Sequence, residues 1–122
     1  MHELSIAMSL VEIAADEAAK LGASRVIAVQ VRVGALSGVV PDALAFCWEM
    51  ASADSPIAGA RLQIDEVPVT IHCDACNAER ALASPQHLRC PSCGAPALKI
   101  TAGRDLALTA LEISDDHVGA HR

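Results

Sequence analysis

Residues 73–93 read CDACNAERALASPQHLRCPSC and contain four of the five cysteines of the chain. Thirteen residues separate two Cys-x2-Cys pairs, which are Cys73 with Cys76 and Cys90 with Cys93. Two residues between ligands let one tight turn present both sulfurs to a single ion, and two such pairs complete a tetrahedral site. Asn77 and Gly94 follow the pairs, and both residue types accept the left-handed backbone in which such a turn ends. The spacing therefore predicts a four-thiolate metal site.

The identity of the metal is less strongly determined than its ligands. A closed site of four thiolates is typical of structural zinc, because it leaves no position for water or substrate. A rubredoxin-like iron site uses the same ligands, and buried thiols or two disulfides are further alternatives. His72 and His87 lie close to the cysteines in the chain and could each replace a thiolate. With four cysteines at suitable spacing, we favour solvated or hydrogen-bonding histidines.

The segments on either side of the cysteines predict an α+β unit. Apolar residues recur every three or four positions in residues 4–21 and 41–53, which predicts two amphipathic helices. Apolar and polar residues alternate in residues 27–33, 60–65 and 106–111, which predicts strands. We therefore expect an α+β fold in which two helices cover a small three-stranded antiparallel sheet, with an inserted zinc-ribbon subdomain.

The length of 122 residues suits one domain with a small insert and excludes two full-sized domains. We expect residues 1–69 and 103–114 to form the α+β domain, residues 70–102 the metal-binding insert, and residues 115–122 a flexible tail. The insert has hardly any large apolar side chain. Metal binding, worth ~10–16 kcal/mol for structural zinc, therefore takes the place of a hydrophobic core.

Composition and charge exclude several classes of function. The formal net charge is −6, and the chain has no Tyr, one Phe and one Trp, which disfavours nucleic-acid binding. The sequence contains no apolar run of about 18 residues and therefore predicts no membrane span. The start MHELSIAMSL lacks the basic region of a signal peptide, so we expect a cytoplasmic protein. No phosphate-binding glycine loop or catalytic triad is apparent, and we expect no enzymatic activity.

Met1, His2 and Glu3 offer a second kind of metal site. A free α-amine, the backbone nitrogen of residue 2 and the His2 imidazole can close fused chelate rings on one ion. Such planar nitrogen ligands suit Ni(II) or Cu(II) rather than zinc. The residues alone favour His2 as an exposed side chain without a ligand.

Landmarks along most of the chain resemble a known family. They are MHELSIA at residues 1–7, VRVG at 31–34, LSGVVPDAL at 36–44, the CDAC and CPSCG pairs, and ITAGRDLALTALEI at 100–113. In this order they resemble the HypA/HybF family of hydrogenase-maturation nickel metallochaperones. The resemblance implies that the α+β domain binds one Ni(II) through the His2 imidazole, the Met1 amine and the backbone nitrogens of His2 and Glu3. It further implies that the four cysteines hold structural zinc, and it gives weaker roles to the Glu3 side chain and Asp42.

The same resemblance implies delivery of nickel for maturation of [NiFe]-hydrogenase. The implied partners are the maturation GTPase of the same pathway and the hydrogenase large subunit. A homodimer is compatible with the sequence, and we expect no nucleic-acid or membrane partner. The main alternative is a zinc-ribbon scaffold for protein interactions without nickel transfer. Two further hypotheses are a rubredoxin-like electron carrier and a zinc-ribbon nucleic-acid adaptor.

Overall fold

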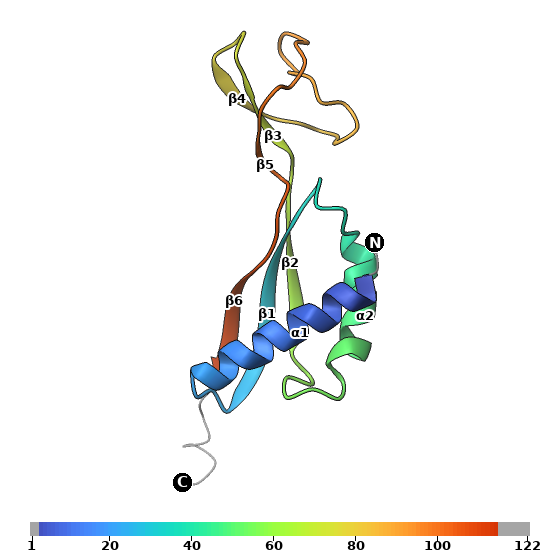
Figure 1. Ribbon diagram of the computed structural model, residues 1–122, viewed down its shortest axis with the longest axis vertical. Helices are drawn as coiled ribbons and strands as arrows, with labels where there is room; N and C mark the ends of the chain where they lie inside the picture. Colours follow the sequence, from blue (N-terminus) through green and yellow to red (C-terminus); the bar gives the residue numbers. More distant parts are fainter. Residues whose placement is uncertain (1–2, 115–122) are drawn as a thin grey trace.

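The computed structural model describes residues 3–114, which form two helices and two small sheets (Figure 1). The main sheet has the strand order β2 (Arg61–Val67), β1 (Arg25–Gly34), β6 (Leu106–Ser114). The insert sheet has the order β4 (Ala78–Ala81), β3 (Thr70–Cys73), β5 (Ile100–Ala102). Helices α1 (Glu3–Lys20) and α2 (Pro41–Ser52) lie against one face of the main sheet, and the insert projects beyond its end. The two helices, the three-stranded sheet and the insert agree with the predicted fold class.

Helix α1 buries a stripe of small and medium apolar side chains against the main sheet. Its buried residues are Ala7, Leu10, Val11, Ala14 and Ala18. The helix ends at Lys20, and Gly22, two residues later, has a φ of 67° in the left-handed region. There the Gly22 amide donates to the Ala19 carbonyl and the Ala23 amide to the Ala18 carbonyl, at 3.1 and 3.0 Å. These bonds satisfy carbonyls that the end of a helix otherwise leaves free.

Helix α2 is fixed at both of its ends by contacts with other elements. Pro41 occupies its first turn, and Val40 caps it without a side-chain hydrogen bond of its own. Instead the Val40 amide donates to Oε2 of Glu3, at 3.2 Å, which joins the starts of the two helices. Further along, buried Trp48 donates from Nε1 to the Ala60 carbonyl at 2.8 Å, which ties α2 to the segment entering β2.

The pairing within the main sheet corrects one prediction. Strands β1 and β6 are antiparallel, as expected, but β1 and β2 are parallel, so the sheet is mixed rather than antiparallel. The reason is the connection between β1 and β2. Because the chain passes through α2 before it re-enters the sheet, it returns to the starting end of β1 and runs in the same direction.

The insert contains strands that the sequence patterns did not predict. Strands β3, β4 and β5 are only 4, 4 and 3 residues long. They form an antiparallel sheet around a small apolar cluster whose buried members are Val69, Ile71, Cys73, Leu82 and Cys90. Two of these five are cysteines. The other three are Val69, Ile71 and Leu82, so the insert has a small apolar cluster of its own beside the sulfurs.

Three segments of chain cross where the insert joins the main sheet. The Gly34 amide donates to the Asp105 carbonyl, and the Leu36 amide to the Gly103 carbonyl, both at 2.7 Å. Gly34 is buried, and a Cβ atom placed on it would lie 2.3 Å from the Gly103 carbonyl oxygen. Gly103 has a φ of 102°, and a Cβ there would lie 2.8 Å from the Val69 Cα. The absence of side chains at both glycines therefore permits the crossing.

Neither helix within residues 3–114 combines the length and the hydrophobicity needed to cross a membrane. Met1, His2 and the segment 115–122 lie outside the described residues.

Gly34→Ala tests the crossing of the three segments. Since the new methyl group meets backbone atoms that cannot move away cheaply, we expect unfolding to become easier by about 2–4 kcal/mol in urea titrations. Gly22→Ala is the control, because it adds the same atom at a φ of 67° where nothing lies within 4 Å. It should cost only about 1–2 kcal/mol, from left-handed strain alone. Equal losses in the two variants would contradict the crowding at Gly34.

Candidate metal centre

The insert brings the four predicted cysteines together. Their sulfur atoms all lie within 4.8 Å of one another, with Cys73 Sγ 3.5 Å from Cys93 Sγ and Cys76 Sγ 3.8 Å from Cys90 Sγ. A divalent metal bound tetrahedrally at a metal–sulfur distance of about 2.3 Å requires sulfurs about 3.8 Å apart. A disulfide would require about 2.05 Å, and all five cysteines are free thiols. The donor set therefore fits a single metal ion and not a pair of disulfides.

Two tight turns hold the sulfurs in this arrangement. Asn77 and Gly94, which follow the two pairs, have φ values of 53° and 78°, which confirms the predicted left-handed turn ends. In the second turn the Gly94 amide donates to the Cys90 carbonyl, and the Cys90 amide to the Ala95 carbonyl, both at 2.8 Å. The first pair follows directly from β3, whose last residue is Cys73. The end of β3 thus positions the first pair, and a hydrogen-bonded turn positions the second.

Backbone amides next to the sulfurs favour the thiolate form of Cys90. The amide of Cys93, and less strongly that of Ser92, hydrogen-bonds to its sulfur and lowers the pKa of Cys90 to about 6, against the effect of burial. At Cys93 the amide of Ala95 acts in the same direction. There the neighbouring sulfurs of Cys73 and Cys76, together with burial, outweigh it and raise the pKa to about 12. Without a cation the cluster therefore cannot carry four thiolates at neutral pH, and a bound divalent ion would supply the missing positive charge.

The four sulfurs are unequally accessible. Cys73 and Cys90 are buried, Cys76 is half-buried and Cys93 is exposed. Access from solvent is therefore easiest on the Cys93 side of the cluster.

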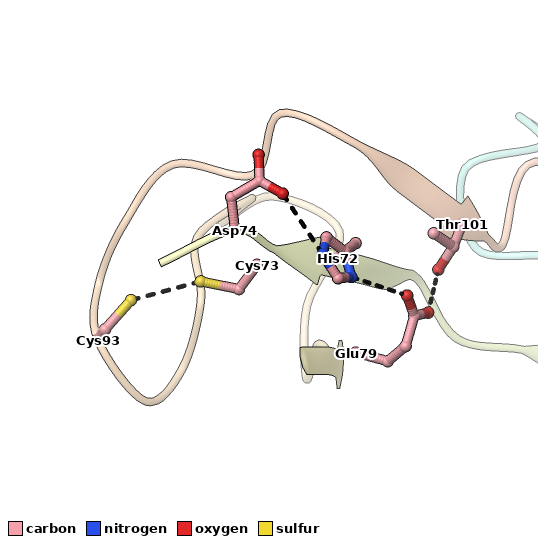
Figure 2. A network of polar contacts seen from close by, with 6 residues as sticks. All are labelled: His72, Cys73, Asp74, Glu79, Cys93 and Thr101. Atoms are coloured by element: carbon pink, nitrogen blue, oxygen red, sulfur yellow. Dashed lines mark hydrogen bonds and ion pairs between the residues drawn. The ribbon is translucent and has the colours of Figure 1, made fainter. Parts of the chain in front are cut away.

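His72 turns away from the sulfurs and toward two carboxylates (Figure 2). Its Nδ1 lies 3.3 Å from Oε2 of Glu79, and its Nε2 lies 3.4 Å from Oδ1 of Asp74. Oε1 of Glu79 in turn accepts a hydrogen bond from Thr101 Oγ1 at 2.7 Å, which connects β4 to β5. His87 is exposed in the loop between the cysteine pairs. Within residues 3–114, no His, Asp or Glu joins the cysteine cluster as a potential ligand.

Arg80 lies on β4, and the sequence patterns do not mark it as part of this centre. Interaction with the thiols of Cys76 and Cys90 raises the pKa of Arg80 above its ordinary value. Arg80 is four residues after Cys76 and ten residues before Cys90, and no local motif marks it.

The residues expected at the second metal site are described only in part. Met1 and His2 lie outside the described residues. Glu3 is the first residue of α1, and its carboxylate accepts the Val40 amide. Asp42 is exposed in the first turn of α2, two residues after Val40. Glu3 and the segment that carries Asp42 are therefore neighbours. Cys47, expected as a small buried residue, is half-buried and packs against the main core.

Comparison with protein families gives a match over nearly the whole chain. A family model described as "Hydrogenase/urease nickel incorporation, metallochaperone, hypA" matches residues 1–113. Two curated relatives carry the name "Hydrogenase maturation factor HypA". The one from Roseiflexus sp. is 52% identical over 116 residues, covering 95% of this chain and 94% of the relative. The one from Chloroflexus aurantiacus is 53% identical over 112 residues, covering 92% and 98%.

Two solved structures have a fold similar to that of this chain. The solution structure of the Ni metallochaperone HypA from Helicobacter pylori is similar to this chain with a TM-score of 0.65 and 25% identity. The similarity covers 93% of this chain and 98% of that one. A second structure, described as the solution structure of HypA protein, has a TM-score of 0.66 at the same identity.

Cys90→Ser tests the cysteine cluster as the support of the insert. The change removes one sulfur ligand and leaves the neighbouring amides without that acceptor, so we expect bound metal to be lost. Hydrogen exchange should accelerate in β3 and β5, while β1 keeps its protection. Cys47→Ser is the matched control, since it removes a thiol from the main core and should leave the metal content unchanged. Retention of metal and of insert protection in Cys90→Ser would contradict the assignment.

Proposed function

This chain belongs to the HypA family of nickel metallochaperones for hydrogenase maturation, and from that premise we propose that it binds one Ni(II) ion at its start and delivers it for assembly of [NiFe]-hydrogenase. The observation that carries the proposal is the match that begins at residue 1 and includes Met-His-Glu. The proposed ligands are the His2 imidazole, the Met1 amine and the backbone nitrogens of His2 and Glu3. Nitrogen ligands in one plane suit Ni(II).

The start of α1 supports the backbone nitrogen of Glu3 as a ligand. Glu3 is the first residue of the helix, and the first four N–H groups of an α-helix have no intrahelical carbonyl partner. Coordination of the Glu3 nitrogen therefore costs the helix no hydrogen bond. The Glu3 carboxylate, by contrast, is engaged with the Val40 amide, so we assign it to holding the two helix starts together rather than to the first set of ligands.

For the cysteine cluster we propose a resident structural Zn²⁺ held by Cys73, Cys76, Cys90 and Cys93. Its support is the chemistry of four thiolates around one closed position, which leaves no site for water or substrate. When bound, the ion supplies positive charge and cross-links the two turns. The protein positions the ligands. The amides of Ser92 and Cys93 orient the Cys90 sulfur, the amide of Ala95 orients the Cys93 sulfur, and Cys73 is the last residue of β3.

We propose that nickel and zinc bind in two different parts of the chain, each of which has its own apolar cluster. We assign nickel binding to residues 1–69 with 103–114, and zinc binding to residues 70–102. The main cluster lies between the two helices and the main sheet, and a separate cluster surrounds the cysteines. Val69 lies just before the boundary and packs with the insert.

Delivery requires partners and a suitable compartment. We propose the GTPase of the maturation pathway and the hydrogenase large subunit as partners, and a second copy of the chain as a further one. A reducing compartment such as the cytoplasm would keep the four thiols available for metal. The rival proposal is a zinc-ribbon scaffold without nickel transfer, and it predicts that His2 is dispensable for every metal the protein holds.

His2→Ala tests the nickel site. In calorimetric titration of the tag-free full chain, we expect the parent to bind one Ni(II) in addition to the metal already held by the cysteines. The variant should lose this nickel-binding step, because without the His2 imidazole one chelate ring cannot close. His87→Ala is the matched control: it removes an exposed imidazole from the insert and should leave the nickel step intact. Equal nickel binding by His2→Ala and the parent would favour the scaffold.

A further inference from the structure

The loop between β1 and α2, residues 35–40, contacts three parts of the molecule (Figure 1). Leu36 is half-buried and packs against the apolar cluster of the insert. Val39 is buried in the main core between the helices and the main sheet. Val40 is exposed, and its amide donates to the Glu3 carboxylate at 3.2 Å. The side chain that packs on the insert therefore lies only four residues before the amide that holds the start of α1.

The backbone of loop 35–40 is constrained along most of its length. The Leu36 amide donates at 2.7 Å to a carbonyl of the segment that returns from the insert. The Ser37 hydroxyl oxygen accepts the Val39 amide at 3.2 Å. Pro41 constrains the other side, because the residue before a proline is disfavoured in the helical conformation. Val40 is accordingly extended, with φ of −91° and ψ of 114°. Constraints on both sides therefore fix the direction of the Val40 amide.

The Val40 amide acts on a residue of the proposed nickel site. Glu3 is half-buried and is the first residue of α1, and its backbone nitrogen is a proposed nickel ligand. The contact of the Glu3 carboxylate with Val40 restricts the backbone of Glu3. A ligand atom that is held in place before the ion arrives loses less conformational freedom on binding than one on a freely moving chain. Nickel binding at residue 3 therefore benefits from a contact with a residue 37 positions away in the sequence.

We propose that Leu36 is a positioning residue of the nickel site. By packing on the insert, Leu36 holds loop 35–40 in the position from which the Val40 amide reaches the Glu3 carboxylate. This inference rests on the proposed function, which places Ni(II) on Met1, His2 and Glu3. It does not depend on which metal the four cysteines hold.

Leu36→Ala tests the inference, because it removes the side chain that packs on the insert and keeps the backbone donors of the loop. In calorimetric titration of the tag-free full chain, Ni(II) should bind about fivefold more weakly, the low end of what ordering one further residue on binding costs. Leu36→Met keeps a similar side-chain volume and should recover most of the parent affinity. Leu88→Ala is the matched control, since Leu88 is also half-buried against the insert cluster but belongs to the segment between the cysteine pairs. It should bind nickel like the parent.

Two further measurements separate positioning of Glu3 from a general loss of stability. In a Glu3→Ala background, Leu36→Ala should weaken nickel binding no further, because the contact through which it acts is already absent. Hydrogen exchange of the Val40 amide should accelerate in Leu36→Ala, while the amides of β1 keep the protection of the parent.

Three results would overturn the inference while leaving the proposed function intact. They are an unchanged nickel affinity in Leu36→Ala, an equal weakening in Leu88→Ala, and additive losses in the variant that combines Leu36→Ala with Glu3→Ala. If His2→Ala binds nickel like the parent, the proposed nickel site is wrong, and the inference is overturned together with it.

Discussion

Convergence of four cysteine sulfurs within 4.8 Å is the constraint on which the insert depends. Its apolar cluster has five buried residues, and two of them are Cys73 and Cys90, which are themselves members of the sulfur group. Strands of three and four residues cannot form a stable sheet without further support. The turns, the sheet and the cluster therefore depend on the same sulfurs. A metal that binds them stabilises all three together.

The insert is joined to the main sheet by backbone hydrogen bonds and by Leu36, which packs against the apolar cluster of the insert. Gly34 and Gly103 allow two segments to approach so closely that no Cβ atom fits between them. Hydrogen bonds of 2.7 Å from Gly34 to Asp105 and from Leu36 to Gly103 then fix the crossing. The crossing therefore depends on two positions that carry no side chain.

The sequence predicted what depends on local chemistry and missed what depends on distant contacts. Cysteine spacing and the residue types of Asn77, Gly94 and Gly22 specify turns, and those predictions are confirmed. The parallel pairing of β1 with β2 was predictable, because a strand, a helix and a strand in succession require it. The hydrogen bond from the Val40 amide to Glu3 joins residues that no motif relates, so only the folded chain reveals it.

The two proposed metal sites differ in the features that govern exchange. At the cysteines, backbone amides favour the thiolate form of Cys90, and three of the four cysteines are at least half-buried. The proposed nickel ligands lie instead at the start of α1, where the helix dipole places about half a positive charge. The dipole repels a bound cation there, while the Glu3 carboxylate, which attracts a cation, is engaged with the Val40 amide. Weak retention at the helix start is what a delivered ion needs, and firm retention among the sulfurs is what a structural ion needs.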